Sequence, residues 1–172
     1  TSLVSSGQMN IAEYTVLHEL RERCRRAVAT AFGEAELHYS GALVTAISAK
    51  KEPAATSKAN CNATIGERMV AGSRWHLPAY CHAHVDKCSI LSYDVSAVLY
   101  LSDAASIDGG DFAFLDSDGV DRHVQLRAGR LLAFGSGVEH VHRVCRVESG
   151  ERVALAIWFT LSRAHAQPTE EV

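Results

Sequence analysis

The sequence has few of the features that mark fibrous, low-complexity or membrane-spanning chains. Only 3 prolines and 12 glycines occur among its 172 residues, which excludes a collagen-like repeat and a disordered linker. The longest apolar run, "VALAIWFTL", has the length of a strand, whereas a membrane-spanning helix needs about 20 apolar residues. The start of the chain does not join basic residues to an apolar stretch as a signal peptide does. We therefore expect no membrane segment in this chain.

The chain also lacks an excess of positive charge. Its 17 lysines and arginines against 20 acidic residues give a formal net charge of -3. A protein that binds nucleic acid needs a basic surface, so we expect no nucleic-acid partner. The composition, 47% hydrophobic and 22% charged, is that of a globular protein. The length predicts a single domain over residues 1–172 with its own hydrophobic core.

The cysteines are 5 in number and contain no C-x-x-C pair, so a structural zinc knot is not expected. One or two disulfides remain open, because the sequence does not determine their pairing. The triplet "NAT" at Asn62 fits the acceptor pattern for N-glycosylation, which applies only to a secretory protein.

Residues 10–33 predict one long helix, because apolar side chains recur there at steps of three and four residues and Gly33 is a suitable stop. Short alternating segments separated by turn residues follow and predict strands. A polar loop is expected at 50–60. One helix followed by many short strands predicts a mainly β protein, a barrel or sandwich with a supporting helix. The predicted strands are 36–48, 94–102, 111–116, 123–127, 129–136, 139–144 and 152–160.

The stretch "YCHAHVDKCS" places His82, His84 and Asp86 at alternate positions, so an extended chain would present all three on one face. His140 and His142 repeat the H-x-H pattern further along. Two imidazoles and one carboxylate on one side of an octahedral ion form the facial triad of non-haem Fe(II) oxygenases. Because the chain has 9 histidines, the spacing alone leaves structural or surface roles open.

The segment "RVALAIWFT" places Arg152 on the same face as two alanines, while the opposite face is uniformly apolar. A guanidinium beside open space is suited to two-point binding of a carboxylate. Tyr100, on another predicted strand, would add a hydroxyl; an edge arginine and a core tyrosine are the structural alternatives. Gly109 and Gly110 predict a tight bend or bulge, and Trp158 is interpreted as a ring that fills the barrel.

Four blocks of the sequence, taken in order, resemble the Fe(II)- and 2-oxoglutarate-dependent dioxygenases of the prolyl-hydroxylase-like branch. Within that branch the resemblance is strongest to the prolyl 3-hydroxylases and related oxygenase-domain proteins. It covers about residues 76–163 and implies a double-stranded β-helix, a jelly-roll barrel. The blocks are "HVDKC", "YDVSAVLYLSD", "DGGDFAF" and "AGRLLAFGSGVEHVHRVCRVESGERVALAIWFT".

The resemblance implies a role for five residues. The metal-binding positions of the family fall on His84, Asp86 and His142. Its cosubstrate-binding basic residue falls on Arg152, and the tyrosine that binds the far carboxylate of 2-oxoglutarate falls on Tyr100. The metal ligands and the arginine together form the implied catalytic set.

Two neighbouring histidines, His82 and His140, stay outside this implied set. Close relatives often carry asparagine where this chain has His140, and we expect this departure to affect the surroundings of the metal and the choice of substrate.

The implied function is that of an Fe(II)- and 2-oxoglutarate-dependent dioxygenase, which uses O2 to hydroxylate a C–H bond and releases succinate and CO2. Ascorbate is a further candidate cofactor. The resemblance favours a proline in a peptide or protein as the substrate. The alternatives are a free amino acid or other small molecule, and a catalytically silent jelly-roll that binds a partner. The resemblance and the triplet at Asn62 together favour the endoplasmic reticulum.

Overall fold

The helix α1 (Ile11–Phe32) begins and ends at residues that satisfy its free backbone groups. The Asn10 side chain accepts a hydrogen bond from the Glu13 backbone N–H at 3.0 Å, and the Glu13 carboxylate accepts one from the Asn10 N–H at 2.9 Å. This reciprocal pair is a capping box. At the other end Gly33 has φ 69°, a left-handed conformation that glycine adopts at little cost. The predicted helix over 10–33 is therefore confirmed.

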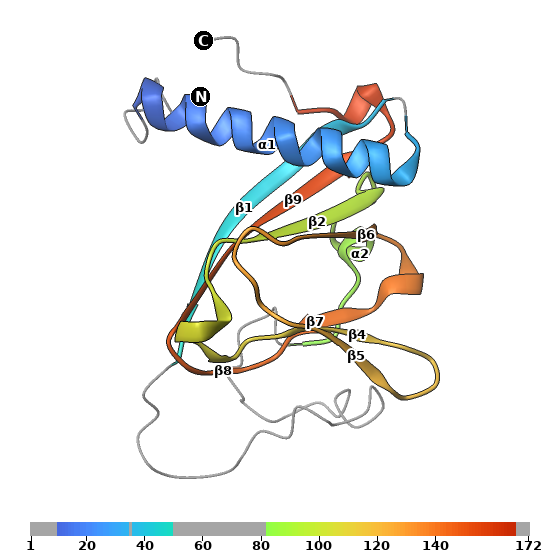
Figure 1. Ribbon diagram of the computed structural model, residues 1–172. Helices are drawn as coiled ribbons and strands as arrows, with labels where there is room; N and C mark the ends of the chain where they lie inside the picture. The colour runs from blue at the N-terminus through green and yellow to red at the C-terminus, as the bar shows by residue number, and fades with distance from the viewer. Residues whose placement is uncertain (1–9, 35, 50–81, 168–172) are drawn as a thin grey trace.

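The structure is a computed structural model that describes residues 10–34, 36–49 and 82–167. Its strands form three antiparallel sheets with the orders β1-β9-β2-β6, β5-β4-β7 and β3-β8 (Figure 1). The strands are β1 (His38–Ser48), β2 (Val95–Tyr100), β3 (Asp108–Gly109), β4 (Phe112–Leu115), β5 (Asp121–Val124), β6 (Leu131–Gly135), β7 (His142–Val144), β8 (Val147–Ser149) and β9 (Glu151–Thr160). The short helices are α2 (Asp86–Ser89), η3 (Ala104–Ser106), η4 (Val138–His140) and η5 (Arg163–His165).

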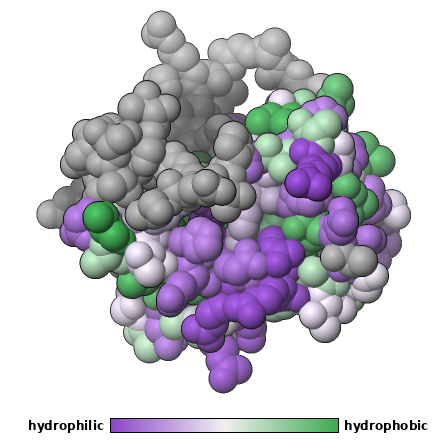
Figure 2. Space-filling model, turned by 90° about the horizontal axis from the view of Figure 1, so that it is seen from above, coloured by the Kyte–Doolittle hydropathy of each residue, from purple (hydrophilic) through white to green (hydrophobic). Residues whose placement is uncertain are grey.

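The helix α1 packs against the outer face of the four-stranded sheet (Figure 1). Burying one valine or leucine side chain contributes roughly 1.5–3 kcal/mol, so this layer is a substantial part of the stability. Its opposite side is exposed, and Figure 2 shows hydrophilic side chains gathered on the face seen from above. The buried cluster consists of Cys24, Val28, Leu37, Val95, Ala97, Leu99, Leu155, Ile157 and Phe159.

A second core lies between the four-stranded sheet and the smaller sheets. The alternation of side chains along β2 separates the two cores, because Ala97 and Leu99 belong to the helix side whereas Val98 and Tyr100 belong to the inner side. The inner side is where the candidate site lies. Its buried members are Ile47, Tyr100, Phe112, Leu126, Phe134, Val144, Val147 and Ala154.

The predicted fold class, mainly β with one supporting helix, is confirmed, although the sheets are not closed into a continuous barrel. The bend predicted at Gly109 and Gly110 is also confirmed, since both have positive φ, 75° and 76°, and the β3–β8 register shifts beside Gly109. Two strands were placed only partly right: of the predicted 123–127, only His123 and Val124 belong to β5. Of the predicted 139–144, only His142–Val144 is a strand, and Val138–His140 forms a turn of 3-10 helix.

Some features expected from the sequence cannot be followed in the structure. The polar loop at 50–60, the triplet at Asn62, Cys61 and Cys81 lie outside the described residues. Within the described ranges Cys24 and Cys88 are free thiols. Of the helices described, none combines the length and the apolar composition that crossing a bilayer requires.

Candidate metal centre

Two backbone hydrogen bonds bring His84 and His142 together from distant parts of the chain. The N–H of each residue donates to the carbonyl of the other, at 2.9 and 3.0 Å, which makes an isolated antiparallel bridge. His142 is the first residue of β7, and the ring centroids of the two histidines lie 4.4 Å apart. The pairing of two backbones therefore fixes both imidazoles on one side of the inner cavity.

Each imidazole is oriented by a carbonyl two residues earlier in the chain. His84 Nδ1 lies 2.8 Å from the carbonyl oxygen of His82, and His142 Nδ1 lies 2.9 Å from that of His140. A carbonyl can only accept, so both Nδ1 atoms carry the proton and both Nε2 atoms keep a free lone pair. Histidine ligands of metals in proteins are held in the same way.

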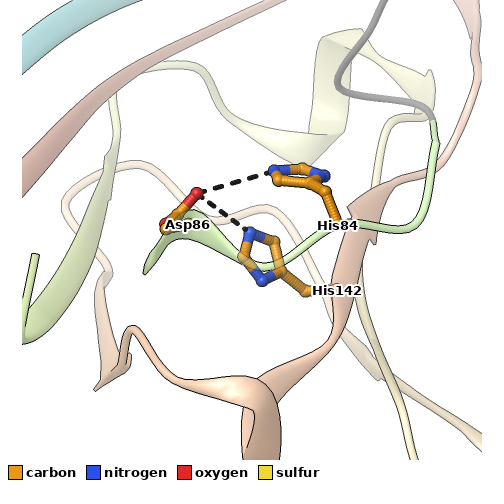
Figure 3. Close-up of side chains that lie close together, drawn as sticks. All are labelled: His84, Asp86 and His142. Atoms are coloured by element: carbon orange, nitrogen blue, oxygen red, sulfur yellow. Dashed lines mark ion pairs between the residues drawn. The ribbon is translucent and has the colours of Figure 1, made fainter. Parts of the chain in front are cut away.

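The carboxylate of Asp86 completes the group (Figure 3). Its Oδ1 lies 3.6 Å from Nε2 of His84 and 3.7 Å from Nε2 of His142. One donor atom from each of the three residues lies within 4.8 Å of the others. Adjacent donors around an octahedral ion with bonds of about 2.1 Å are about 3 Å apart, so only small side-chain shifts would separate this arrangement from a coordination shell.

The other oxygen of Asp86 is occupied by two protein donors. Oδ2 accepts a hydrogen bond from the Ser96 hydroxyl at 2.7 Å and another from the Trp158 indole N–H at 2.9 Å. Asp86 is the first residue of α2, and the backbone N–H of the next residue, Lys87, donates to the Ser136 carbonyl at 3.0 Å. The position of the carboxylate is thus fixed in two ways, by hydrogen bonds to its own oxygen and by a backbone hydrogen bond of the helix that carries it.

Aromatic rings surround the buried imidazole of His142. The Phe112 ring stacks on it with centroids 4.9 Å apart and an angle of 17°, and the Phe134 ring meets it edge-on at 4.9 Å. Burial lowers the pKa of His142, because the charged imidazolium is poorly solvated there. The neutral form is the one that binds metal ions, so these surroundings fit a ligand role.

A cavity of about 500 Å³ opens beside the three residues, and the buried Arg152 lies in its wall. Only 2% of Arg152 is exposed, and its Nε donates to the Gly110 carbonyl at 3.0 Å. Gly110 has φ 76°, and a Cβ there would come 3.3 Å from Cδ of Arg152. The glycine therefore allows the backbone to approach the arginine closely. The small residues Ala154 and Ala156 also line the cavity. This was predicted, because they alternate with Arg152 along one strand, β9.

Tyr100 lies next to Arg152 and is not among the residues that line the cavity. Its ring centroid is 5.4 Å from the guanidinium carbon, and the residue is fully buried. Its hydroxyl has no hydrogen-bond partner among the described residues. Burial raises the pKa of Tyr100, and the nearby Arg152 opposes this shift. An unpaired buried hydroxyl beside a cation fits a site that receives an anionic group.

The local chain path differs from the extended segments that the sequence predicted. Asp86 begins a helix and His140 lies in a 3-10 turn, so neither the segment 82–86 nor the segment 140–142 is a continuous strand. His82 is exposed. The ring of His140 lies 3.0 Å from the Gly135 carbonyl and packs against aromatic rings. Neither His82 nor His140 belongs to the candidate metal-binding group.

Sequence reasoning missed Ser96 and Trp158. Trp158 was interpreted as a filling ring, but its N–H reaches Asp86. The available signal was that it shares a strand face with Arg152, which places both side chains in the same cavity.

The sequence also matches characterised families. Residues 72–160 match the family model described as the 2OG-Fe(II) oxygenase superfamily. The chain is 46% identical over 88 residues to 2-oxoglutarate and iron-dependent oxygenase domain-containing protein 3 of Xenopus tropicalis, which covers 51% of this chain and 27% of that protein. It is 45% identical over 76 residues to prolyl 3-hydroxylase 1 of Rattus norvegicus, which covers 43% of this chain and 10% of that protein. This chain thus spans less than a third of either relative.

Among solved structures, an oxidoreductase of the 2OG-Fe(II) oxygenase family from Burkholderia pseudomallei superposes with a TM-score of 0.60. The superposition covers 86% of this chain and 55% of that one, at 19% sequence identity. At this identity the likeness establishes the fold, which is the jelly roll.

Proposed function

The chain belongs to the 2OG-Fe(II) oxygenase superfamily, and from this membership we propose that it is a hydroxylase whose metal site is the group His84, Asp86 and His142. The family implies Fe(II), 2-oxoglutarate and O2 as cofactors. The donor set supports iron, because two neutral imidazoles and one carboxylate leave open positions on an octahedral ion. A closed four-ligand site would leave no such room.

The observation that carries the proposal is a buried arginine in the same cavity as the three metal-binding candidates. Arg152 would bind the far carboxylate of 2-oxoglutarate, and the hydroxyl of the neighbouring Tyr100 would donate a further hydrogen bond. A buried ion pair of this kind is strong when complete and costly when one partner is removed.

Iron and 2-oxoglutarate, when bound, would supply the activation of O2 that oxidises a C–H bond. The residues of the chain hold and shield the reacting groups. The backbone bridge between His84 and His142 keeps both Nε2 atoms directed to one point. Apolar side chains of the cavity wall, among them Phe112, Phe134 and Val144, surround that point.

The proposed substrate is a proline in a peptide or protein. The likeness to prolyl 3-hydroxylase 1, 45% identity over 76 residues, supports this choice. The cavity supports a substrate that arrives from the solvent, because Leu43 and Ile90 line it and are 54% and 45% exposed. These apolar side chains would contact the peptide on either side of the target residue.

The test is to incubate the protein with Fe(II), 2-oxoglutarate and a panel of proline-rich peptides, with and without ascorbate. We expect succinate and a mass gain of one oxygen on proline. Asp86→Ala should abolish succinate formation, and the matched control His82→Ala should keep most of it, since only the backbone carbonyl of His82 contacts the site.

Three results would change the proposal. Turnover of free amino acids without peptide turnover would show that the substrate is a free amino acid and not a peptide. Equal losses in both variants would overturn the ligand set. Absence of Fe(II) binding in the unmodified protein would indicate a silent binding module.

A further inference from the structure

The two oxygens of Asp86 have different surroundings. Oδ1 faces the two imidazoles, whereas Oδ2 accepts hydrogen bonds from Ser96 and Trp158. An ionised carboxylate can bind a metal through one oxygen or through both. The donors on Oδ2 occupy the lone pairs that the second mode needs.

We propose that Ser96 and Trp158 are positioning residues that restrict Asp86 to one metal bond. This inference rests on the metal site proposed above. With one bond from each of the three ligands, an octahedral ion keeps about three open positions. A second carboxylate bond would leave about two, which is too few for a cosubstrate that chelates the metal and for O2 together.

The Trp158 indole is held in place by stacking. Its ring lies parallel to that of Tyr93, with centroids 5.1 Å apart and an angle of 6°. On β1, Gly41 lies against both rings, and a Cβ there would come 2.9 Å from the Tyr93 hydroxyl and 3.3 Å from the Trp158 ring. The rings therefore fit into the space that the glycine leaves, and the N–H keeps its direction toward Asp86.

The Ser96 hydroxyl also contacts a second serine. Ser96 and Ser136 are each 1% exposed, and their hydroxyl oxygens are 2.7 Å apart. A hydroxyl has one proton, and the carboxylate of Asp86 can only accept. Ser96 therefore donates to Asp86, and Ser136 donates to Ser96. Without the Ser136 hydroxyl, Ser96 still donates its hydrogen bond to Asp86. Ser136→Ala is therefore a matched control.

The experiment counts the water molecules on bound Mn(II), a redox-stable substitute for Fe(II), in the absence of 2-oxoglutarate. The number is measured from the broadening of the Mn(II) electron paramagnetic resonance lines in 17O-enriched water. The variants are Ser96→Ala, Trp158→Phe, which keeps the stacked ring, and the two combined. Circular dichroism confirms that each is folded.

We expect about three waters in the unmodified protein and in Ser136→Ala, and about two in the combined variant, because Asp86 then binds through both oxygens. The combined variant should also bind 2-oxoglutarate more weakly, since one position is closed. A role in packing alone would weaken the fold without changing the water count.

Two outcomes would overturn the inference, and they are distinguishable. An unchanged water count in the folded combined variant would refute the positioning role and leave the metal site intact. Absence of Mn(II) binding in the unmodified protein, checked with Fe(II), would refute the proposed function and this inference with it.

Discussion

Replacing Arg152 by methionine tests the assignment of the cosubstrate site. The side chain is 2% exposed and lies in the cavity wall, with Nε on the Gly110 carbonyl. Methionine has a similar length and no charge, so it fills much of the same space. Replacing a buried charge by an apolar side chain of similar volume is often neutral for folding, and we expect the variant to remain folded.

The expected loss of affinity follows from the cost of leaving a carboxylate buried without its partner. That cost is about 2–5 kcal/mol. Since about 1.4 kcal/mol corresponds to a factor of ten, the dissociation constant for 2-oxoglutarate should rise at least about 30-fold. Binding of the metal should change little, because none of the three candidate ligands is altered.

Isothermal titration of 2-oxoglutarate into the Mn(II)-loaded protein measures this change. The matched control is Arg122→Met. Arg122 is an exposed arginine of the β4–β5 hairpin that pairs with Asp116 and Asp118 and does not line the cavity. A change of less than about threefold in Arg152→Met, with metal binding intact, would show that the carboxylate is held elsewhere.

Two further substitutions test the supports of the site. Asp94→Asn should destabilise the fold by about 1–2 kcal/mol at neutral pH. Burial alone would raise the pKa of Asp94, but hydrogen bonds, first among them the one from Lys87, hold it below its ordinary value of 3.8. That stability is present above the ordinary pKa of 3.8 and is lost as pH falls through the lowered one. The difference in stability between the protein and the variant, measured by urea titration, should therefore shrink as pH falls below 3.8; a difference that stays constant there would contradict the account. Gly110→Ala should cost about 1–2 kcal/mol through its positive φ and also weaken 2-oxoglutarate binding, because its Cβ would push on Arg152. Gly119→Ala, at φ 77° with open space around the Cβ, should cost stability alone, and equal binding in both variants would argue against a role of Gly110 at the site.

The sequence predicted those secondary-structure elements that are determined by residues close together in the chain. The helix over 10–33 follows from apolar spacing and from capping residues within a few positions of each end. The strand that carries Arg152 was also predicted, because the alternation of its residues runs through the whole of 152–160. The segment before His142 was wrong because an H-x-H pattern occurs in a turn as readily as in a strand. The pairings of His142 with Phe114 and with His84, both far away in the sequence, show where the strand begins.

The parts of the site that could not be predicted depend on contacts between distant segments. Trp158 reaches Asp86 across 72 positions of the chain, and nothing in the residues around either one indicates the contact. The same holds for the Ser96–Ser136 pair. The resemblance to a family supplied the candidate ligands, but the side chains that orient them emerged only from the folded arrangement.

The backbone bridge between His84 and His142 has a consequence for how the protein acquires its metal. The bridge joins residues from distant parts of the chain, so an unfolded chain offers no ready-made chelate. A cation that binds the native state alone stabilises it in proportion to the logarithm of its free concentration. Iron supply would then influence how much of this protein persists in the cell, before any reaction takes place.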